Sequence, residues 1–287
     1  MTICAVILDY RGAQKTEACL LSLIAQGIDT VLVVDNSEDQ EASQQLADAA
    51  ARVRQKDADY SLHIVTTGAN LGFAGGVNFA LGHEKARHCE AFLLLNNDAT
   101  IYPGSVEQLD HALKKHAADL VSPAIIDDEG TPQPMMWYQR FFGLMTYKRL
   151  PGSYPYLCGC CLMFRRDLLV SEKLFDEDFF MYGEDTLLGW RLLREHKEFA
   201  CIETATVRHT GQGKFAPSTL FYEYHMTRAH ILLALKTRNN LLEIPVLLVG
   251  KCIGLIARGI RRSIRYRQSA PLLAFILAWR SFHIRKV

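Results

Sequence analysis

The sequence predicts an α/β fold with a mostly parallel central sheet and flanking helices. Short aliphatic, β-branched runs alternate with longer helical patterns through the first half of the 287-residue chain. Polar residues follow the ends of successive predicted strands, as they do where ligands bind at the carboxyl edge of a parallel sheet. A C-terminal helical amphipathic tail completes the pattern.

Each element of the alternating half has its own signal. Apolar runs predict strands over residues 3–8, 31–34, 63–66 and 91–95. Helical patterns follow them near residues 16–26, 41–54, 77–86 and 105–115. In the second half, a strand is predicted at 161–164, a helix at 184–195, and one or two strands over 199–209. This order is that of a doubly wound sheet, in which helices connect parallel strands.

Residues 128–156 interrupt the alternation. This stretch is rich in Pro, Gly, Met and aromatic residues, which makes it too irregular for a core element and too apolar for a linker. It predicts a substrate-side loop or lid. Its aromatic side chains either line a substrate cleft or seat the lid on the core, and they include Trp137, Tyr138, Phe141 and Phe142.

The C-terminal segment is basic. Residues 241–287 hold nine Lys or Arg against the single acid Glu243, so the formal net charge of +1 leaves about −7 on the first 240 residues. At helical spacing, one face collects Arg258, Arg261, Arg262 and Arg265, and another collects Ile256, Ile260 and Ile264. Such a tail suits an anionic membrane surface. It also suits a solvated basic face on a helical hairpin packed against the body.

Composition also indicates the cellular compartment and the kinds of binding partner to expect. The N-terminal sequence lacks the features of a secretory signal, so a cytosolic body with reduced cysteines is expected. The cluster of Cys158, Cys160 and Cys161 forms either a structural zinc site or small buried hydrophobic positions. No stretch reaches the roughly 20 apolar residues of a membrane-spanning helix. No nucleic-acid partner is expected, because basic and aromatic residues are not interleaved on the body.

Three predicted strand ends carry groups that meet at one edge of a parallel sheet. The second strand ends in Asp35, and the fourth in Asn97 and Asp98. Between them, NLGFAGGVNFAL puts glycines at 72, 75 and 76, which would let the backbone approach a ligand closely. A carboxylate here suits a hard divalent cation that also binds nucleotide phosphates. Taken singly, each polar group has an alternative use in an Asx turn or helix N-cap.

A second acidic cluster lies downstream, in FDEDFFMYGED. A carboxylate among aromatic residues can have a raised pKa and serve as a general base. Asp185, which opens a predicted helix, is the candidate base, and helix capping is its alternative role. Farther on, His209 ends a predicted strand before a glycine-rich turn, where it either ligates a metal or is structural.

Seven motifs follow one another along the chain: VILDYRG, VVDNS, NLGFAGGVNFAL, LLLNNDATIYPG, CGCCLMFRRDLL, FDEDFFMYGEDTLLGWRL and RHTGQG. In this order they resemble glycosyltransferase family 2, and in particular its rhamnosyltransferase-like branch. The resemblance covers about residues 2–215. It implies the GT-A type of nucleotide-diphospho-sugar transferase fold and an inverting single displacement assisted by Mg²⁺ or Mn²⁺.

By position, the resemblance also assigns roles to single residues. It implies that the nucleotide-sugar donor is bound by Asp9, Tyr10, Asp35, Asn70, Gly72, Gly76, Asn78 and Asn97. Within this set, Asp35 is expected to contact the nucleobase. The metal motif reads Asn-Asn-Asp, so Asp98 is its remaining carboxylate and His209 is the expected second ligand. Asp185 is the implied general base, and Glu184 is expected to orient the acceptor.

The predicted function is therefore the transfer of a sugar, L-rhamnose from its thymidine-diphosphate donor, to a glycan acceptor linked to a polyprenyl lipid. A GT-A domain is expected at residues 1–218, and a C-terminal helical, basic, membrane-associating extension at 219–287. The enzyme is expected in the cytoplasm, peripheral on the inner face of the plasma membrane.

Three alternatives remain at this point. One is a transferase with another nucleotide-sugar donor. Another is a catalytically silent relative that acts as a membrane-associated binding or assembly subunit, against which the carboxylates of Asp98 and Asp185 argue. The third is a sugar nucleotidyltransferase, which should have a glycine-rich basic loop after the first strand, where this chain has only Gly12.

Overall fold

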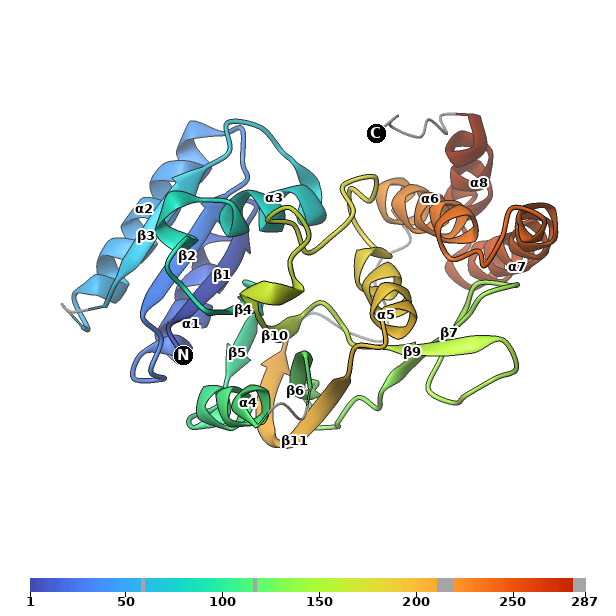
Figure 1. The fold of residues 1–287 in the computed structure, drawn as a ribbon. Coiled ribbons are helices and arrows are strands. Elements are labelled where there is room, and N and C mark those ends of the chain that lie inside the picture. The colour runs from blue at the N-terminus through green and yellow to red at the C-terminus, as the bar shows by residue number, and fades with distance from the viewer. Residues whose placement is uncertain (58–59, 116–117, 211–218, 281–287) are drawn as a thin grey trace. The chain divides into compact units, whose positions relative to one another are not determined.

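The computed structural model describes residues 1–57, 60–115, 118–210 and 219–280, which belong to two compact units (Figure 1). The first unit comprises Met1–Gln133, Leu157–Phe175 and Leu192–Gly213. The second comprises Pro134–Tyr156, Asp176–Arg191 and Lys214–Val287. It therefore groups two earlier segments of the chain with the C-terminal helices. The functional boundary expected after residue 218 stays a prediction.

The first unit is built on an eight-stranded sheet in the order β3-β2-β1-β4-β10-β6-β11-β5 (Figure 1). Its strands are β1 (Ile3–Asp9), β2 (Thr30–Asp35), β3 (Leu62–Thr66), β4 (Ala91–Leu95), β5 (Ala99–Ile101), β6 (Leu120–Ile126), β10 (Cys161–Arg165) and β11 (Phe199–His209). The strands β3, β2, β1 and β4 are parallel to one another, and β6 is parallel to β11. β10 and β5 run antiparallel to their neighbours. The predicted α/β fold with a mostly parallel sheet is confirmed.

Helices cover both faces of this sheet. On one face, α1 (Ala13–Leu23), α2 (Gln40–Arg54) and α4 (Ser105–Lys114) share a core cluster with β1, in which Leu20 and Leu46 pack with Ile7. On the other face lies α3 (Gly72–Leu81), where a Cβ added at Gly76 would lie 2.4 Å from Leu8 Cδ1. Ile7 and Leu8 serve opposite faces because side chains alternate along a strand.

The predicted boundaries agree best where strands are buried on both faces. β1, β2 and β4 lie within one residue of the expected runs, since such strands are nearly continuous apolar sequence. The partly exposed edge strand β3 also lies within one residue of its expected run. A helix lies where one was expected near 77–86, but the predicted bounds are wrong. α3 begins earlier, at Gly72, and ends at Leu81 before a separate 3₁₀ turn, η1 (Glu84–Ala86). The short β5 and the proline-containing β6 were not predicted.

The second unit contains a three-stranded antiparallel sheet in the order β8-β7-β9. Its strands are β7 (Met136–Gln139), β8 (Leu144–Thr146) and β9 (Ser153–Tyr156). The prediction of an irregular loop over residues 128–156 is therefore wrong for most of that range. Tyr138, Tyr154 and Tyr156 are almost fully buried in a cluster with Phe179 and Trp190. These strands are only three or four residues long, and β9 contains Pro155, so they lack the clear alternation by which strands are recognised.

Four helices accompany the small sheet. α5 (Glu184–Arg194) begins in the second unit, and the C-terminal helices are α6 (Leu220–Lys236), α7 (Glu243–Tyr266) and α8 (Ala270–Arg280) (Figure 1). A shorter turn, η2 (Arg166–Leu168), belongs to the first unit. None of the helices described is both long and apolar enough to cross a membrane.

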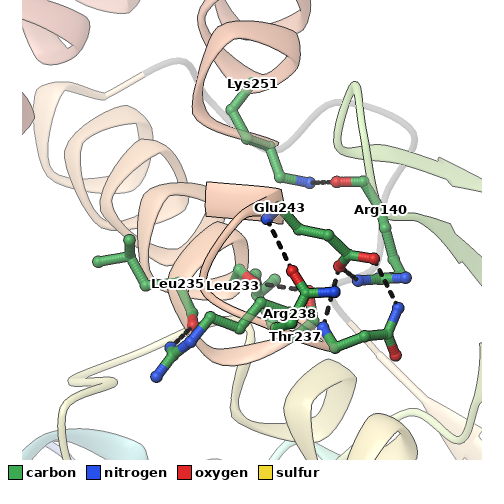
Figure 2. A network of polar contacts seen from close by, with 9 residues as sticks. Arg140, Leu233, Leu235, Thr237, Arg238, Glu243 and Lys251 are labelled. Carbon is green, nitrogen blue, oxygen red and sulfur yellow. Dashed lines mark hydrogen bonds and ion pairs between the residues drawn. The ribbon is translucent and has the colours of Figure 1, made fainter. Parts of the chain in front are cut away.

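A buried polar network joins α7 to the small sheet. The Lys251 Nζ atom donates to the Tyr138 hydroxyl at 2.8 Å and to the Arg140 carbonyl at 2.5 Å, the second contact being drawn in Figure 2. Tyr138 also meets His230 Nδ1 of α6 at 2.9 Å. Burial lowers the pKa of Lys251 well below its ordinary value, and the charge of Arg140 adds to the effect. The network fixes which face of α7 turns inward.

Glycines on the same inward face bring α7 close to the turn after β7. A Cβ added at Gly254 would lie 2.0 Å from the Phe142 carbonyl oxygen, and one at Gly250 would lie 2.5 Å from that of Phe141. At Gly259 the nearest atom is a methyl of Leu272, 3.1 Å away at the end of a side chain that can rotate.

Gly254→Ala should therefore destabilise the protein, whereas Gly259→Ala in the same helix should not. The clash with backbone at 254 is expected to cost about 1–3 kcal/mol, in excess of the roughly 1 kcal/mol gained in helix propensity. Thermal unfolding of both variants measures the difference. A Gly254→Ala protein as stable as the Gly259→Ala protein would contradict the close approach of the 141–142 backbone.

Candidate functional site

The carboxyl end of β1 is closed by the side chain of Asp9. Its carboxylate is buried and accepts hydrogen bonds from the Gly12 amide at 3.2 Å, from the Thr16 hydroxyl, and from Asn97 Nδ2 at 3.3 Å. A Cβ at Gly12 would lie 2.6 Å from Asn97 Nδ2, so glycine leaves room for this contact. Asp9 thus holds together the turns after β1 and β4. Tyr10 follows it and is half exposed.

Asp35, at the end of β2, lies opposite Asp9 in the parallel register. It is 1% exposed, and its oxygens accept from the Ser37 amide at 3.0 Å, the Ser37 hydroxyl at 2.5 Å and the Ser43 hydroxyl at 2.5 Å. Two donors from the β2–α2 turn and one from the first turn of α2 therefore fix this carboxylate. Its expected contact with a nucleobase stays a prediction.

The glycine-rich loop is fastened to β2 by Asn36. Asn36 Nδ2 donates to Asn70 Oδ1 at 3.1 Å and to the Gly72 carbonyl at 3.2 Å, and its Oδ1 accepts from the Leu71 amide at 2.9 Å. The Gly72 amide donates to Asn70 Oδ1 at 3.0 Å. Gly72 has a φ of +72°, a conformation that favours glycine at the start of α3. Asn70 and Gly72 are thus held beside the end of β2.

Two of the expected donor-binding residues have structural partners that the sequence did not reveal. Gly76 allows α3 to pack against Leu8, as described above. The Asn78 side chain is buried and forms three hydrogen bonds with the backbone of residues 174–175. Its Oδ1 accepts from the Leu174 and Phe175 amides at 3.0 and 3.1 Å, and its Nδ2 donates to the Phe175 carbonyl at 2.8 Å. Asn78 therefore positions the chain just before the acidic segment.

Asp98 and His209 meet although 111 positions separate them. β5 pairs with β11 so that His209 lies opposite Ala99, the residue after Asp98. His209 Nε2 lies 3.0 Å from Asp98 Oδ1. The Asp98 carbonyl also accepts from the Thr210 amide at 3.0 Å and its hydroxyl at 2.7 Å. His209 is 8% exposed, and its buried Nδ1 has no hydrogen-bond partner among the residues described.

This pair fits a hard divalent cation. A carboxylate oxygen and a neighbouring imidazole nitrogen are ligands that Mg²⁺ and especially Mn²⁺ accept. The remaining coordination positions would be left to phosphate oxygens and water. Asn97, next to Asp98, instead uses its amide nitrogen on Asp9 and on the Thr16 hydroxyl at 3.1 Å. In the described ranges, no three His, Cys, Asp or Glu side chains gather into a metal-binding group.

The predicted base and its neighbour lie in the second unit, at the start of α5. Gly183, with a φ of +88°, turns the chain into the helix. Asp185 Oδ1 accepts from the Thr186 amide at 2.6 Å and from the Thr186 hydroxyl at 3.1 Å. The N-terminus of a helix stabilises a negative charge at this position. The side chain of Asp185 is only partly buried, so it combines helix capping with access to solvent.

Glu184 differs from its neighbour in burial. It is 7% exposed, and its Oε2 atom is buried with no hydrogen-bond partner in the described structure. Burial, and then the charge of Asp185, raise the pKa of Glu184 to about 8. Glu184, whose raised pKa favours the protonated form, therefore directly precedes Asp185, whose carboxylate lies at the N-terminus of α5.

Two other carboxylates of the acidic segment are paired with a residue that sequence reasoning missed. Lys236 of α6 lies 2.6 Å from an Asp176 oxygen and 2.7 Å from an Asp178 oxygen. The partners are some 60 residues apart, and no local pattern connects them. The five-carboxylate cluster expected from the sequence is thus divided, and Glu184 and Asp185 remain as the pair at the helix.

Comparison with known proteins places this geometry in a family. The profile of Glycosyl transferase family 2 matches residues 4–171, more than half of the chain. The chain belongs to this family and is a glycosyltransferase.

Two curated relatives carry sugar-transfer names. The Low-salt glycan biosynthesis hexosyltransferase Agl10 of Haloferax volcanii is 26% identical over 232 residues, covering 76% of this chain and 71% of that protein. The N-acetylglucosaminyl-diphospho-decaprenol L-rhamnosyltransferase of Mycobacterium tuberculosis is 27% identical over 220 residues, covering 66% of this chain and 69% of that protein. The chain is rhamnosyltransferase-like at this low identity.

Solved structures agree on the fold. The mannosyltransferase PcManGT of Pyrobaculum calidifontis, in complex with GDP-Man and Mn²⁺, has a TM-score of 0.58 at 14% identity and covers 98% of this chain and 88% of its own. TarS of S. aureus, in complex with UDP-GlcNAc, has a TM-score of 0.59 at 16% identity, with 97% and 79% covered. The expected GT-A fold is confirmed.

The raised pKa of Glu184 predicts a pH-dependent stability. The folded state holds the proton more tightly than the unfolded chain, so this group's contribution is full below a pKa near 4.5 and is lost as the pH rises toward about 8. Relative to Glu184→Gln, the wild type should therefore lose on the order of 2 kcal/mol of unfolding free energy between about pH 5 and 8. Urea unfolding at several pH values measures this loss.

Glu195→Gln, at an exposed position just after the same helix, is the matched control. It removes a carboxylate without changing a buried group, so its difference from wild type should not vary over this pH range. If the difference in unfolding free energy between wild type and Glu184→Gln were also independent of pH, it would contradict the burial of the Glu184 carboxyl group, whose Oε2 atom has no hydrogen-bond partner in the described structure.

Proposed function

We propose that the chain is an inverting glycosyltransferase that transfers L-rhamnose from a thymidine-diphosphate donor to a lipid-linked glycan acceptor. The observation that carries the proposal is the contact of Asp98 with His209, in a chain of this family, beside the polar carboxyl ends of β1 and β4. The similarity to a mycobacterial L-rhamnosyltransferase acting on a decaprenol-linked sugar supports the choice of donor and acceptor class.

Asp98 and His209 are the proposed ligands of Mg²⁺ or Mn²⁺. The Mn²⁺ bound with GDP-Man in the structurally similar mannosyltransferase supports this assignment. When bound, the cation supplies positive charge to the donor diphosphate, which makes it a better leaving group. Asn70, Gly72, Gly76, Asn78 and Asn97 remain the proposed donor-side residues, with Asp9, Tyr10 and Asp35 at the nucleoside.

Asp185 is the proposed general base. Its carboxylate takes the proton of the acceptor hydroxyl as the hydroxyl oxygen bonds to the anomeric carbon of the donor. The bond from that carbon to the diphosphate oxygen breaks at the same time, and the nucleoside diphosphate leaves with the electron pair. Attack opposite the leaving group inverts the anomeric configuration. Glu184, in its protonated form, is proposed to donate a hydrogen bond that orients the acceptor.

An acceptor attached to a polyprenyl lipid would bring the reaction to a membrane. We place the enzyme in the cytoplasm, at the inner face of the plasma membrane, where a nucleotide-sugar and a lipid-linked glycan can meet. This location follows from the proposed acceptor.

Asp185→Asn should abolish transfer while leaving donor binding intact. The isosteric amide keeps the shape of the helix start but cannot accept a proton, so the turnover rate should fall by on the order of 10²–10⁴-fold. Release of nucleoside diphosphate is measured with a panel of nucleotide-sugars, Mn²⁺ and a membrane lipid extract as acceptor. Donor affinity is measured separately by calorimetry.

The panel distinguishes the proposal from its alternatives. Release from thymidine-diphosphate-rhamnose that is lost in Asp185→Asn supports both donor and base. Release from another donor keeps the reaction class and overturns the rhamnose assignment. Binding of a donor without turnover in the wild type, and an Asp185→Asn variant that behaves identically, would indicate a catalytically silent subunit.

Loss of either proposed ligand should weaken metal binding. Asp98→Asn and His209→Gln are expected to lower the affinity for Mn²⁺, in the presence of a nucleoside diphosphate, by at least about tenfold each. Electron paramagnetic resonance of free Mn²⁺ gives the affinity without requiring turnover. His196→Gln, at an exposed position, is the control. Unchanged affinity in both ligand variants would show that the cation, if bound, lies elsewhere.

A further inference from the structure

A stripe of exposed aliphatic side chains runs along α7 and is called the α7 stripe here. Its members recur every three or four residues and are 42–87% exposed: Leu242, Val246, Val249, Ile253, Ile256, Ile260 and Ile264. This spacing keeps them on one side of the helix over about 33 Å. Exposed aliphatic residues of α8 add to the apolar surface of the C-terminal helices, namely Leu272, Leu273 and Ile276. Contiguous apolar surface of this extent marks an interaction site.

The orientation of α7 is fixed at its N-terminal half by contacts on the other side of the helix. Glu243 pairs with Arg140 at 2.6 Å, as Figure 2 shows. It also accepts a hydrogen bond from the backbone amide of Asn239 at 2.9 Å. These contacts lower the pKa of Glu243 to about 2, the Asn239 hydrogen bonds having the largest effect. Two turns on, Lys251 is fully buried against Tyr138 and Arg140. The helix cannot turn the stripe inward without breaking this network.

The C-terminal half is anchored by a buried carboxylate of α6. Glu223 is fully buried and pairs with Arg258 at 2.6 Å and with Arg262 at 2.5 Å. The single basic face expected from the sequence is therefore divided. Arg258 and Arg262 turn toward α6, whereas Arg261 and Arg265 are exposed. The surface that α7 leaves open is aliphatic, with arginine at its edge.

Beyond Glu243, which is paired with Arg140, the charged side chains around the stripe have one sign. Residues 244–280 contain seven Lys or Arg and no Asp or Glu. After the inward residues are set aside, Arg261, Arg265, Arg267 and Arg280 are exposed in this region. An aliphatic surface bordered by arginines complements a bilayer whose headgroups are anionic.

A second copy of the chain fits the stripe less well. The first six members follow the heptad spacing of a coiled-coil seam, which needs charged pairs at the flanking positions to select a partner. Here one of those positions holds Glu243, whose charge is already paired with Arg140. The others are Pro245, Gly250, Cys252, Ala257 and Gly259, which carry no charge. Arginines of two copies would also approach one another without acids to pair with them.

We propose that the α7 stripe docks on the surface of an anionic bilayer, with its aliphatic side chains at the headgroup boundary and the exposed arginines on lipid phosphates. The helix lies along the surface and does not span the bilayer. The inference deepens the proposed function, since it rests on the lipid-linked acceptor for its purpose. Its test measures binding without turnover, so that either proposal can fail alone.

The test is flotation of the full chain with vesicles of phosphatidylcholine, alone or mixed with phosphatidylglycerol. Replacing Val249, Ile253 and Ile256 together by Gln removes apolar surface at exposed positions while keeping good helix formers. We expect the wild type to bind the mixed vesicles and the triple variant to lose at least about tenfold in affinity. Arg261→Gln combined with Arg265→Gln should weaken binding to the mixed vesicles only, by roughly tenfold.

The control is Leu21→Gln with Val170→Gln, which removes exposed aliphatic side chains from the first unit and should leave binding unchanged. Equal binding by the wild type and the triple variant would overturn the proposal. So would a wild type that binds neither vesicle. A wild-type dimer in sedimentation that the triple variant converts to a monomer, without vesicle binding, would assign the stripe to a second copy instead.

Discussion

The chemistry proposed for this protein depends on the pairing of a three-residue strand with the end of a long one. Among the described residues, β5 pairs in the sheet with β11 alone, and that antiparallel register brings His209 beside Asp98. β11 in turn is held by β6 and carries a bulge between Ile202 and Thr206, after which its register changes. The two proposed ligands thus have their positions fixed by backbone hydrogen bonds, as a site needs if it is to meet a diphosphate without reorganising.

Around this contact, many polar side chains at the carboxyl edge of the sheet form hydrogen bonds with the neighbouring turns and helices of the protein itself. Asp9 and Asp35 accept hydrogen bonds from the turns and helices that follow their strands, and Asn36 holds the glycine-rich loop. These bonds order the backbone at the ends of β1 and β2, where parallel α/β sheets bind their ligands. Polar residues at a strand end can therefore serve a site by positioning it as well as by touching a ligand.

The sequence predicts the buried parallel strands and the family well, because continuous apolar runs and ordered motifs are local signals. It predicts poorly whatever depends on a distant partner. The amphipathic pattern of α7 is plain in the sequence, but which side faces inward depends on Glu223 and Tyr138, which lie on other elements. Likewise, only the structure shows that Lys236 pairs with two carboxylates of the acidic segment, and that the aromatic-rich 136–156 region forms a sheet. The Asp98 and His209 pair was reached through the family resemblance, since strand register cannot be read from spacing.

The most direct test of this account is the position of the metal. Crystals grown with a nucleoside diphosphate and Mn²⁺ would give an anomalous scattering peak for manganese. The account predicts a peak bonded to Asp98 and His209 and to oxygens of the diphosphate. A diphosphate bound with manganese ligated by other side chains, and with Asp98 still hydrogen-bonded to His209, would contradict it.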